Sequence, residues 1–372
     1  MGEKHKVLWV TNTLSCGGAQ KQLLYMYDIL NKYCDYDITV LSYARVEDEI
    51  SIDGVKTVYI DKESTGKCKT VLKIARFIKE HDIDIMHAFG GSMANIYGRA
   101  AAMLCPKTVS VGAMLGKKHF ASRSVRIISS LLNLFGNWWT VNNLELIPIL
   151  KRDLRFLSDS HIKMLHNGFA PYDEVNYQLD QWTDYDQDKN GQFVFTVVGR
   201  LEPVKNYPLF LKAASMVAQK CENVRFWVVG NGTELNYLKQ LSDEYGIADK
   251  VRFWGYREDV DTALSRTDVF VQTSLTEGSP NTIAEAMRAR LPVISTKSTD
   301  LSEMIVPGEN GYIVENDAVL DLAAAMENLL NMDQEQRNQF GEKSYELFEK
   351  NFLDTHVAAE FDAFYRALLQ KR

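Results

Sequence analysis

The chain of 372 residues lacks several features that would assign it to a special class of protein. Its five cysteines are scattered and include no C-x-x-C pair, which argues against a zinc site and against a disulfide framework. No segment holds the ~18 apolar residues that a membrane span needs. The first apolar run is too short for a signal peptide, and no small-residue cleavage site follows it. We therefore expect a folded cytoplasmic protein.

Acidic residues are absent from one long stretch, although the net charge is −7. No Asp or Glu lies between Asp84 and Glu145. The basic residues of that stretch are Arg99, Lys107, Lys117, Lys118, Arg123 and Arg126. Within it, residues 117–139 join a basic start to many apolar side chains, and two interpretations stand. The segment either lies on an anionic membrane, on the inner face of the plasma membrane, or forms a core helix with an exposed basic face. No nucleic-acid partner is expected.

Strand and helix patterns alternate through the chain in two series. Apolar runs at 6–14, 38–44, 55–60, 82–89 and 107–114 alternate with helical patterns, and the series restarts near residue 190. Strands that are apolar on both faces and alternate with helices predict parallel sheets of βαβ units. We expect an α/β protein with two doubly wound, Rossmann-like domains, at 1–172 and 192–350. The polar segment 173–191 would be the linker, and the helix in 351–372 could return to the N-terminal domain.

Two of the strand-to-helix turns carry residues suited to phosphate, which such sheets bind at the carboxyl ends of their strands. Gly17 and Gly18 follow the first strand, where glycines let the backbone approach a phosphate at a helix N-terminus. The motif is not G-x-G-x-x-G, and no acid follows the second strand at the required place, so a nicotinamide cofactor is disfavoured. Arg200 and Lys205 follow the strand that ends at Gly199 and suit a diphosphate. Alternatively, both are solvated loop residues.

A third turn carries an acidic pair. Glu277 lies in a loop after an apolar strand, and Pro280 marks the start of the next helix. The amides of Asn281 and Thr282 would form an anion site there. Glu285, eight positions after Glu277, is flanked by apolar helix residues. A solvated helix glutamate does not explain that setting, whereas a carboxylate that binds a ribose diol does.

These pieces together resemble the retaining glycosyltransferases of family 4, which have the GT-B fold. The matching segments are Gly-Gly-Ala-Gln after the first strand, G-R-x-x-x-x-K at 199–205, V-G-N-G at 229–232, F-W-G-Y-R-E-D-V at 253–260, E-x7-E at 277 and 285, and N-G at 310–311. Their order and spacing match over nearly the whole chain, and the C-terminal motifs are the most specific. The resemblance implies two domains that face each other across a cleft.

The resemblance also implies a role for each motif residue. Glu285 would hold the ribose hydroxyls and Glu277 the donor sugar. Arg200 and Lys205 would stabilise the leaving diphosphate in place of a metal ion, so no metal or other cofactor is expected. The backbone near Tyr256 would meet the base. The donor-binding residues that we predict are Gly17, Gly18, Gly199, Arg200, Lys205, Asn231, Tyr256, Arg257, Glu277, Gly278, Ser279, Pro280, Asn281, Thr282 and Glu285.

Three positions bear on the transferred sugar and the acceptor. Family members often carry His or Arg after the fifth strand, where this chain has Gly112. Thr299 and Asp300 stand where a Gly-Gly pair is usual. His87 ends an apolar strand and is, like Gly112, a candidate for the acceptor side, although a structural histidine explains it equally well.

The function that we predict is transfer of a hexose or N-acetylhexosamine, with retention, from a nucleoside-diphosphate sugar, with UDP expected. The acceptor would be a surface polysaccharide or a lipid-linked glycan, and the alternative is a small soluble acceptor. Two alternatives belong to other functional classes. One is a GT-B epimerase or phosphorylase, and the other is a non-catalytic protein that binds a nucleotide sugar. The intact pairs Glu277–Glu285 and Arg200–Lys205 argue against the non-catalytic binder.

Overall fold

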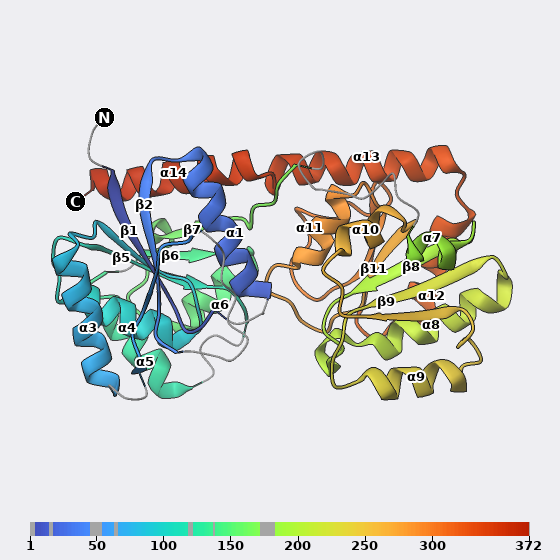
Figure 1. Cartoon of the computed structure of the whole chain (residues 1–372), viewed down its shortest axis with the longest axis horizontal. Coiled ribbons are helices and arrows are strands. Elements are labelled where there is room, and N and C mark those ends of the chain that lie inside the picture. Colours follow the sequence, from blue (N-terminus) through green and yellow to red (C-terminus); the bar gives the residue numbers. More distant parts are fainter. Residues whose placement is uncertain are drawn as a thin grey trace. The chain divides into compact units, whose positions relative to one another are not determined.

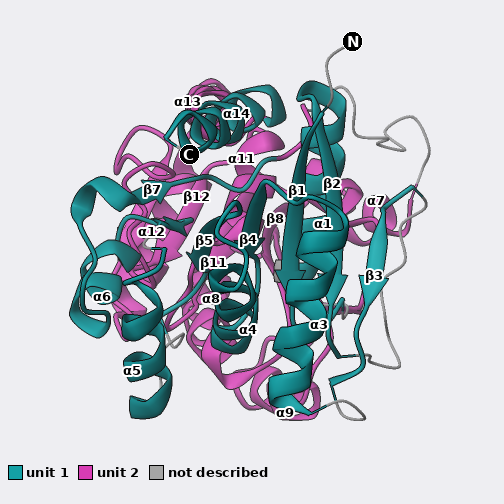
Figure 2. Ribbon diagram, turned by 90° about the vertical axis from the view of Figure 1, so that its left-hand side faces the viewer, with its two compact units in different colours: residues 1–168, 354–372 teal, residues 169–353 magenta. Residues whose placement is uncertain are grey.

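The computed structural model describes residues 4–14, 18–44, 54–62, 66–117, 122–136, 138–171 and 183–371. The chain forms two compact units, residues 1–168 with 354–372 (unit 1) and residues 169–353 (unit 2), coloured separately in Figure 2. Each unit has a parallel sheet covered by helices, which confirms the predicted α/β class. Among the described residues, none of the helices has the length and apolarity to span a bilayer.

Unit 1 contains a seven-stranded parallel sheet with the order β3-β2-β1-β4-β5-β6-β7. Its strands are β1 (His5–Thr11), β2 (Tyr36–Ser42), β3 (Thr57–Tyr59), β4 (Ile85–Ala88), β5 (Val109–Met114), β6 (Trp138–Val141) and β7 (Ile162–Met164). Its helices are α1 (Gly18–Tyr33), α3 (Lys67–Glu80), α4 (Ser92–Met103), α5 (Arg123–Leu132), α6 (Leu146–Asp153) and α14 (Asp354–Gln370), with the short 3-10 helix η1 (Asp159–His161). The chain reverses direction across the sheet between β1 and β4, as in a doubly wound fold.

Helix α14 belongs to unit 1 and packs against α1, which it crosses (Figure 1). Phe361 and Tyr365 of α14 are buried in the same apolar cluster as Trp9 of β1. The indole N–H of Trp9 donates a hydrogen bond of 3.0 Å to the Tyr365 hydroxyl. The apolar positions of α14 therefore complete one face of the first sheet.

Unit 2 contains a six-stranded parallel sheet with the order β10-β9-β8-β11-β12-β13. Its strands are β8 (Phe193–Val198), β9 (Val224–Val229), β10 (Val251–Gly255), β11 (Val269–Gln272), β12 (Val293–Thr296) and β13 (Gly311–Val314). Its helices are α7 (Asp184–Lys189), α8 (Tyr207–Lys220), α9 (Leu235–Glu244), α10 (Val260–Ser265), α11 (Asn281–Arg288), α12 (Val319–Asn331) and α13 (Gln334–Asn351), with the 3-10 helix η3 (Pro203–Lys205). The central strands are buried on both faces, which explains their unbroken apolar runs.

The predicted linker 173–191 is too long, because part of it is structured within unit 2. Thr183 and Asp186 form a capping box that starts α7. Tyr185 of α7 is fully buried, with its ring centroid 5.3 Å from that of Trp227 and 4.4 Å from that of Trp254. One aromatic anchor in a polar segment gives no periodic signal, and the sequence analysis therefore missed this helix.

The stretch 117–139 is not one helix. Helix α5 ends at Leu132, and Trp138 begins strand β6, in which Trp139 is fully buried. The interpretation as a core helix is wrong as well, because the buried residues of α5 are Ser129 and Ser130. Ile127, Ile128 and Leu131 of α5 are exposed, whereas Val125 and Leu132 are half-buried.

Candidate active site

The motif residues of unit 2 gather where the strand order of its sheet reverses. Strand β8 has β9 on one side and β11 on the other, so the loops after β8 and β11 leave neighbouring strands at the same edge. Ligands of doubly wound sheets bind at such a point. Two hydrogen bonds join the loops: the amide of Leu275 donates to the carbonyl of Val204 at 2.8 Å, and the Thr273 hydroxyl donates to the carbonyl of Lys205 at 2.9 Å.

An ion pair between Lys205 and Glu277 lies at the centre of this edge. Lys205 Nζ is 2.7 Å from Glu277 Oε1, and the two side chains are only 20% and 16% exposed. Pro203 starts the 3-10 turn η3 that carries Lys205. Burial, with the nearby Glu277 carboxylate as a second cause, raises the pKa of Tyr207. The site thus holds one cation and one carboxylate side by side in a setting that is largely shielded from water.

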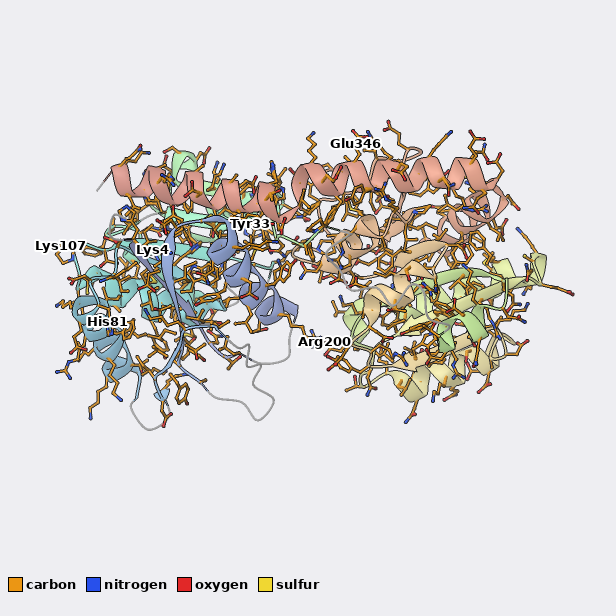
Figure 3. All side chains as sticks on the ribbon, turned by 45° about the horizontal axis from the view of Figure 1, so that its top comes forward. Lys4, Tyr33, His81, Lys107, Arg200 and Glu346 are labelled. Carbon is orange, nitrogen blue, oxygen red and sulfur yellow. The ribbon has the colours of Figure 1, made fainter. Side chains whose placement is uncertain are left out.

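Arg200 differs from Lys205 in its surroundings. Its side chain is 69% exposed and pairs with Glu202, with 2.5 Å between Nη1 and Oε1. Figure 3 shows the Arg200 side chain projecting from its loop. The predicted cationic pair therefore consists of one largely buried lysine and one exposed arginine.

The N-terminus of α11 presents the second predicted acid. Pro280 precedes the helix, and Asn281, Thr282 and Glu285 are partly exposed. The intervening residues Ile283, Ala284, Ala286 and Met287 are fully buried. The half-buried loop 276–279, which includes Gly278 and Ser279, leads into this helix. Glu285 thus lies on the same partly exposed face of α11 as Asn281.

The V-G-N-G segment packs its backbone directly against the loop after β8. A Cβ at Gly230 would lie 1.9 Å from the carbonyl oxygen of Gly199, and one at Gly232 would lie 2.4 Å from that of Leu201. Glycine is therefore required at both positions. The carbonyl of Asn231 accepts a hydrogen bond of 2.9 Å from the Leu201 amide, and its side chain turns back to the Gly232 amide at 2.8 Å.

The two residues that follow β10 have different environments. Tyr256 is 60% exposed. The Arg257 guanidinium bonds to Asp259 at 2.8 Å and to Asp184 at 3.1 Å, and it lies 4.8 Å from the ring centre of Tyr185. The hydrogen bond to Asp259 raises the pKa of Arg257. The Arg257 side chain thus forms ion pairs within unit 2. The predicted contact with the base involves the backbone here and stays a prediction.

Several polar residues that the sequence analysis did not single out as supports hold the acidic loop. The Thr299 hydroxyl donates to the carbonyl of Gly278 at 3.2 Å. The Asn316 side-chain amide donates to the carbonyl of Leu275 at 3.2 Å. Thr299 could have been recognised from the sequence, because it stands where a glycine is expected. Asn316 could not, because a single asparagine in a loop has no distinctive pattern.

The residues of unit 1 that were predicted to take part have other settings. Gly17 lies outside the described residues, and Gly18 is the first residue of α1. His87 is fully buried, with Nδ1 2.9 Å from the Tyr365 hydroxyl and Nε2 2.9 Å from the Thr140 hydroxyl. Burial lowers the pKa of His87 to about 3.

Gly112 is also in the core, where an added Cβ would lie 2.8 Å from the Trp139 ring. Close packing therefore requires glycine at position 112. The hydrogen bonds to two hydroxyls account for a buried histidine at position 87. The acceptor-side assignment of both residues is therefore corrected to a structural role. In the described part of the chain, no three His, Cys, Asp or Glu side chains are placed to hold a metal ion, and metal independence stays a prediction.

Comparison with known proteins finds glycosyltransferases among the proteins that this chain resembles. Residues 182–347 match the family model described as glycosyl transferases group 1. The chain is 27% identical over 263 residues to the UDP-Gal:alpha-D-GlcNAc-diphosphoundecaprenol alpha-1,3-galactosyltransferase of Escherichia coli, a match that covers 66% of each chain. It is 28% identical over 174 residues to the lipopolysaccharide core biosynthesis glycosyltransferase LpsE of Rhizobium meliloti (strain 1021), covering 47% of this chain and 49% of that protein. These matches thus span between about half and two thirds of the relatives' own lengths.

Solved structures match the whole chain. The crystal structure of Anabaena HepE in complex with UDP and glucose has a TM-score of 0.82 at 20% identity and covers 98% of this chain and 100% of its own. The apo form of the lipopolysaccharide outer core galactosyltransferase WaaB has a TM-score of 0.77 at 15% identity and covers 97% and 99%. This similarity confirms the predicted GT-B class of two Rossmann-like domains.

Proposed function

We propose that the protein is a retaining hexosyltransferase that uses a UDP-sugar, with unit 2 as the donor-binding unit. The observation that carries the proposal is the Lys205–Glu277 ion pair at the switch point of a glycosyltransferase domain, next to the N-terminus of α11. Support for UDP comes from one protein of similar structure, Anabaena HepE, which has been crystallised with UDP and glucose and with UDP-glucose.

The geometry suggests how the groups act on the donor. When the diphosphate enters, Lys205 exchanges its contact with Glu277 for phosphate oxygens, and Arg200 adds a second cation from the exposed side of the loop. The positive end of the α11 helix dipole favours the same charge. Glu277 then accepts hydrogen bonds from the sugar hydroxyls, and Glu285 binds the ribose diol. The departing phosphate oxygen takes the proton of the acceptor hydroxyl, so the reaction needs no protein nucleophile.

We propose a lipid-linked glycan or surface polysaccharide as the acceptor, and with it a peripheral position at a membrane. The names of the relatives support this class: one acts on a diphosphoundecaprenol-linked sugar, one serves lipopolysaccharide core biosynthesis and one Vi polysaccharide biosynthesis in Salmonella typhi. A hexose or N-acetylhexosamine is the group transferred.

The test begins with titration calorimetry against UDP, GDP and ADP. It continues with NMR of each UDP-hexose and UDP-N-acetylhexosamine incubated with enzyme and with polyprenyl-diphosphate-linked saccharides. We expect UDP to bind most tightly, and an α-linked product to form with release of UDP. Conversion of the donor to its epimer without UDP release would assign an epimerase. Binding of UDP with no turnover of any donor would assign a non-catalytic binder.

A further inference from the structure

Helix α5 exposes three of its apolar residues, while its half-buried Val125 packs against the core of unit 1. Its buried residues are Ser129 and Ser130, whereas Ile127, Ile128 and Leu131 are 52%, 43% and 53% exposed. A surface helix of a globular protein normally has the opposite arrangement, with its apolar stripe against the core. Figure 2 shows α5 at the periphery of unit 1, beside α4. The exposed side of α5 is thus an apolar surface that its own unit does not cover.

The apolar surface continues beyond the helix. Leu134 and Phe135, in the turn after α5, are 58% and 68% exposed. They follow Ile127 and Leu131 at helical spacing, so the exposed residues form one line. Phe156 is 58% exposed and has φ of 60°, a conformation that bulky residues avoid. We call the following residues the α5 stripe: Ile127, Ile128, Leu131, Leu134, Phe135 and Phe156.

Hydrogen bonds tie the two parts of the α5 stripe together. The Asn133 side-chain amide donates to the carbonyl of Arg155 at 2.9 Å. The Arg155 amide donates to the Ser130 hydroxyl at 3.0 Å. Because Phe156 directly follows Arg155, these bonds place it next to the end of α5.

A buried cation fixes the turn that carries Leu134 and Phe135. The Arg99 guanidinium donates to Asn133 Oδ1 at 2.7 Å and to the carbonyl of Gly136, and it lies 4.6 Å from the ring centre of Trp139. The Trp139 indole donates to the same Asn133 oxygen at 2.9 Å. Arg99 therefore holds both ends of the turn from beneath, and the exposed apolar tip is part of a rigid structure.

The charges around the α5 stripe select its partner. Helices α4 and α5 lie within the stretch that contains no acidic residue, and Arg123 and Arg155 are exposed at the ends of the stripe. Asp153, three positions before Phe156, is only 5% exposed and lies 3.0 Å from Arg152, and the exposed Asp159, three positions after it, pairs with Lys151 at 2.7 Å. An apolar line with a cationic rim matches the interface of an anionic bilayer, where apolar side chains reach the acyl boundary and cations meet the headgroups.

We propose that the α5 stripe inserts into the interface of an anionic lipid bilayer and holds unit 1 there. This inference rests on the proposed function for its purpose, because a lipid-linked acceptor lies in such a bilayer. It also changes the interpretation of the basic stretch. Arg99 is buried, Lys117 pairs with Glu145 at 2.9 Å, and Lys118 lies outside the described residues. Apolar insertion is thus the main contribution, and the cations select the lipid charge.

The test compares exposed apolar residues on α5 with a matched one elsewhere in unit 1. The full chain with Ile127→Ser, Leu131→Ser and Phe135→Ser is co-sedimented with phosphatidylcholine vesicles, with and without phosphatidylglycerol. The control is Leu72→Ser on α3, at a side chain that is 58% exposed, like Leu134. We expect wild type and control to bind the anionic vesicles equally, and the triple variant to bind at least about tenfold more weakly at both low and high salt.

A charge variant and a fluorescence variant complete the test. Arg123→Glu with Arg155→Glu should weaken binding to anionic vesicles only at low salt, because added salt screens the charges. The tryptophan emission that Phe135→Trp adds should shift to the blue on anionic vesicles. Wild type that does not bind vesicles, or a triple variant that binds like wild type, would overturn the proposal. A dimer that the triple variant abolishes, without vesicle binding, would assign the stripe to a second copy and overturn it equally.

Titration with UDP separates this inference from the proposed function. All variants should bind UDP like wild type, because the α5 stripe lies in unit 1 and the proposed donor site in unit 2. Equal UDP binding also shows that unit 2 is folded in each variant. If vesicle binding fails while UDP binding and sugar transfer persist, only the α5 proposal falls. If vesicle binding holds while no nucleoside diphosphate binds, only the proposed function falls.

Discussion

Replacement of Lys205 by methionine should affect stability and activity through different partners. In the unliganded protein, the loss of the ammonium leaves the Glu277 carboxylate, 16% exposed, without the cation that lies at 2.7 Å. An unsatisfied buried polar group costs about 1–3 kcal/mol, and breaking a fully buried ion pair costs about 3–5 kcal/mol. Since some water reaches this pair, we expect a loss of about 2 kcal/mol in the free energy of unfolding of unit 2.

A second substitution distinguishes the two effects. Glu277→Gln in the Lys205→Met background removes the unpaired charge, so stability should return to within about 1 kcal/mol of wild type. Activity should not return, because the diphosphate still lacks its buried cation. For the loss of one such preorganised group we expect kcat/KM to fall about 100–1,000-fold in both variants.

The assay is urea unfolding followed by tryptophan fluorescence, with Trp227 and Trp254 in unit 2, alongside donor turnover. A matched control is the pair Lys220–Glu327, also 2.7 Å apart but with a lysine that is 65% exposed. Lys220→Met should cost less than about 1 kcal/mol and leave turnover unchanged. A Lys205–Glu277 coupling no larger than that of the control, or a double variant with restored activity, would refute the reasoning.

Further expectations concern the ribose, the metal, the acidic loop and the first sheet. Glu285→Ala should weaken UDP binding about 10–100-fold in calorimetry, because a charged hydrogen bond is worth about 1.5–3 kcal/mol; unchanged affinity would remove Glu285 from the ribose site. Turnover should survive EDTA, and loss that manganese restores would contradict the role of Arg200. Thr299→Val should lower kcat about 5–10-fold while Thr299→Ser does not, because only the valine loses the hydroxyl bond to the acidic loop; equal rates would show that this bond does not position Glu277. His87 has a pKa lowered from 6.5 to about 3, so the unfolded state takes up a proton that the folded state refuses, and stability is lost as pH falls from 6.5 towards 3. Between pH 8 and pH 5 this amounts to about 2 kcal/mol, measured as the difference in urea unfolding between wild type and His87→Gln.

The parallel sheets were predictable because strands such as Phe193–Val198 are buried on both faces and leave unbroken apolar runs. The spacing of Glu277 and Glu285 was equally informative, because a helix start lies between them. The two acceptor-side residues were not predictable in the same way. His87 meets hydroxyls that lie 53 and 278 positions away in the chain, and no local pattern records such partners.

Helix α5 shows a different limit of sequence interpretation. Its apolar residues recur at helical spacing, which identifies an amphipathic helix but not which face the protein covers. Two serines lie on the buried face of α5, where hydrogen bonds join Ser130 and Asn133 to Arg155 and the half-buried Val125 packs against the core. The orientation of α5 therefore depends on residues outside it.

Because α14 packs on unit 1, the two units are completed in a fixed order during translation. Unit 2 is continuous from Phe169 to Leu353, so all of its strands are available before α14 has left the ribosome. The core of unit 1 around Trp9 stays incomplete until Phe361 and Tyr365 have been synthesised. During that interval we expect a nascent chain to have a folded unit 2 and an incomplete unit 1, whose uncovered apolar face chaperones would bind. A fragment of residues 169–353 should therefore fold by itself, whereas residues 1–168 expressed alone should aggregate.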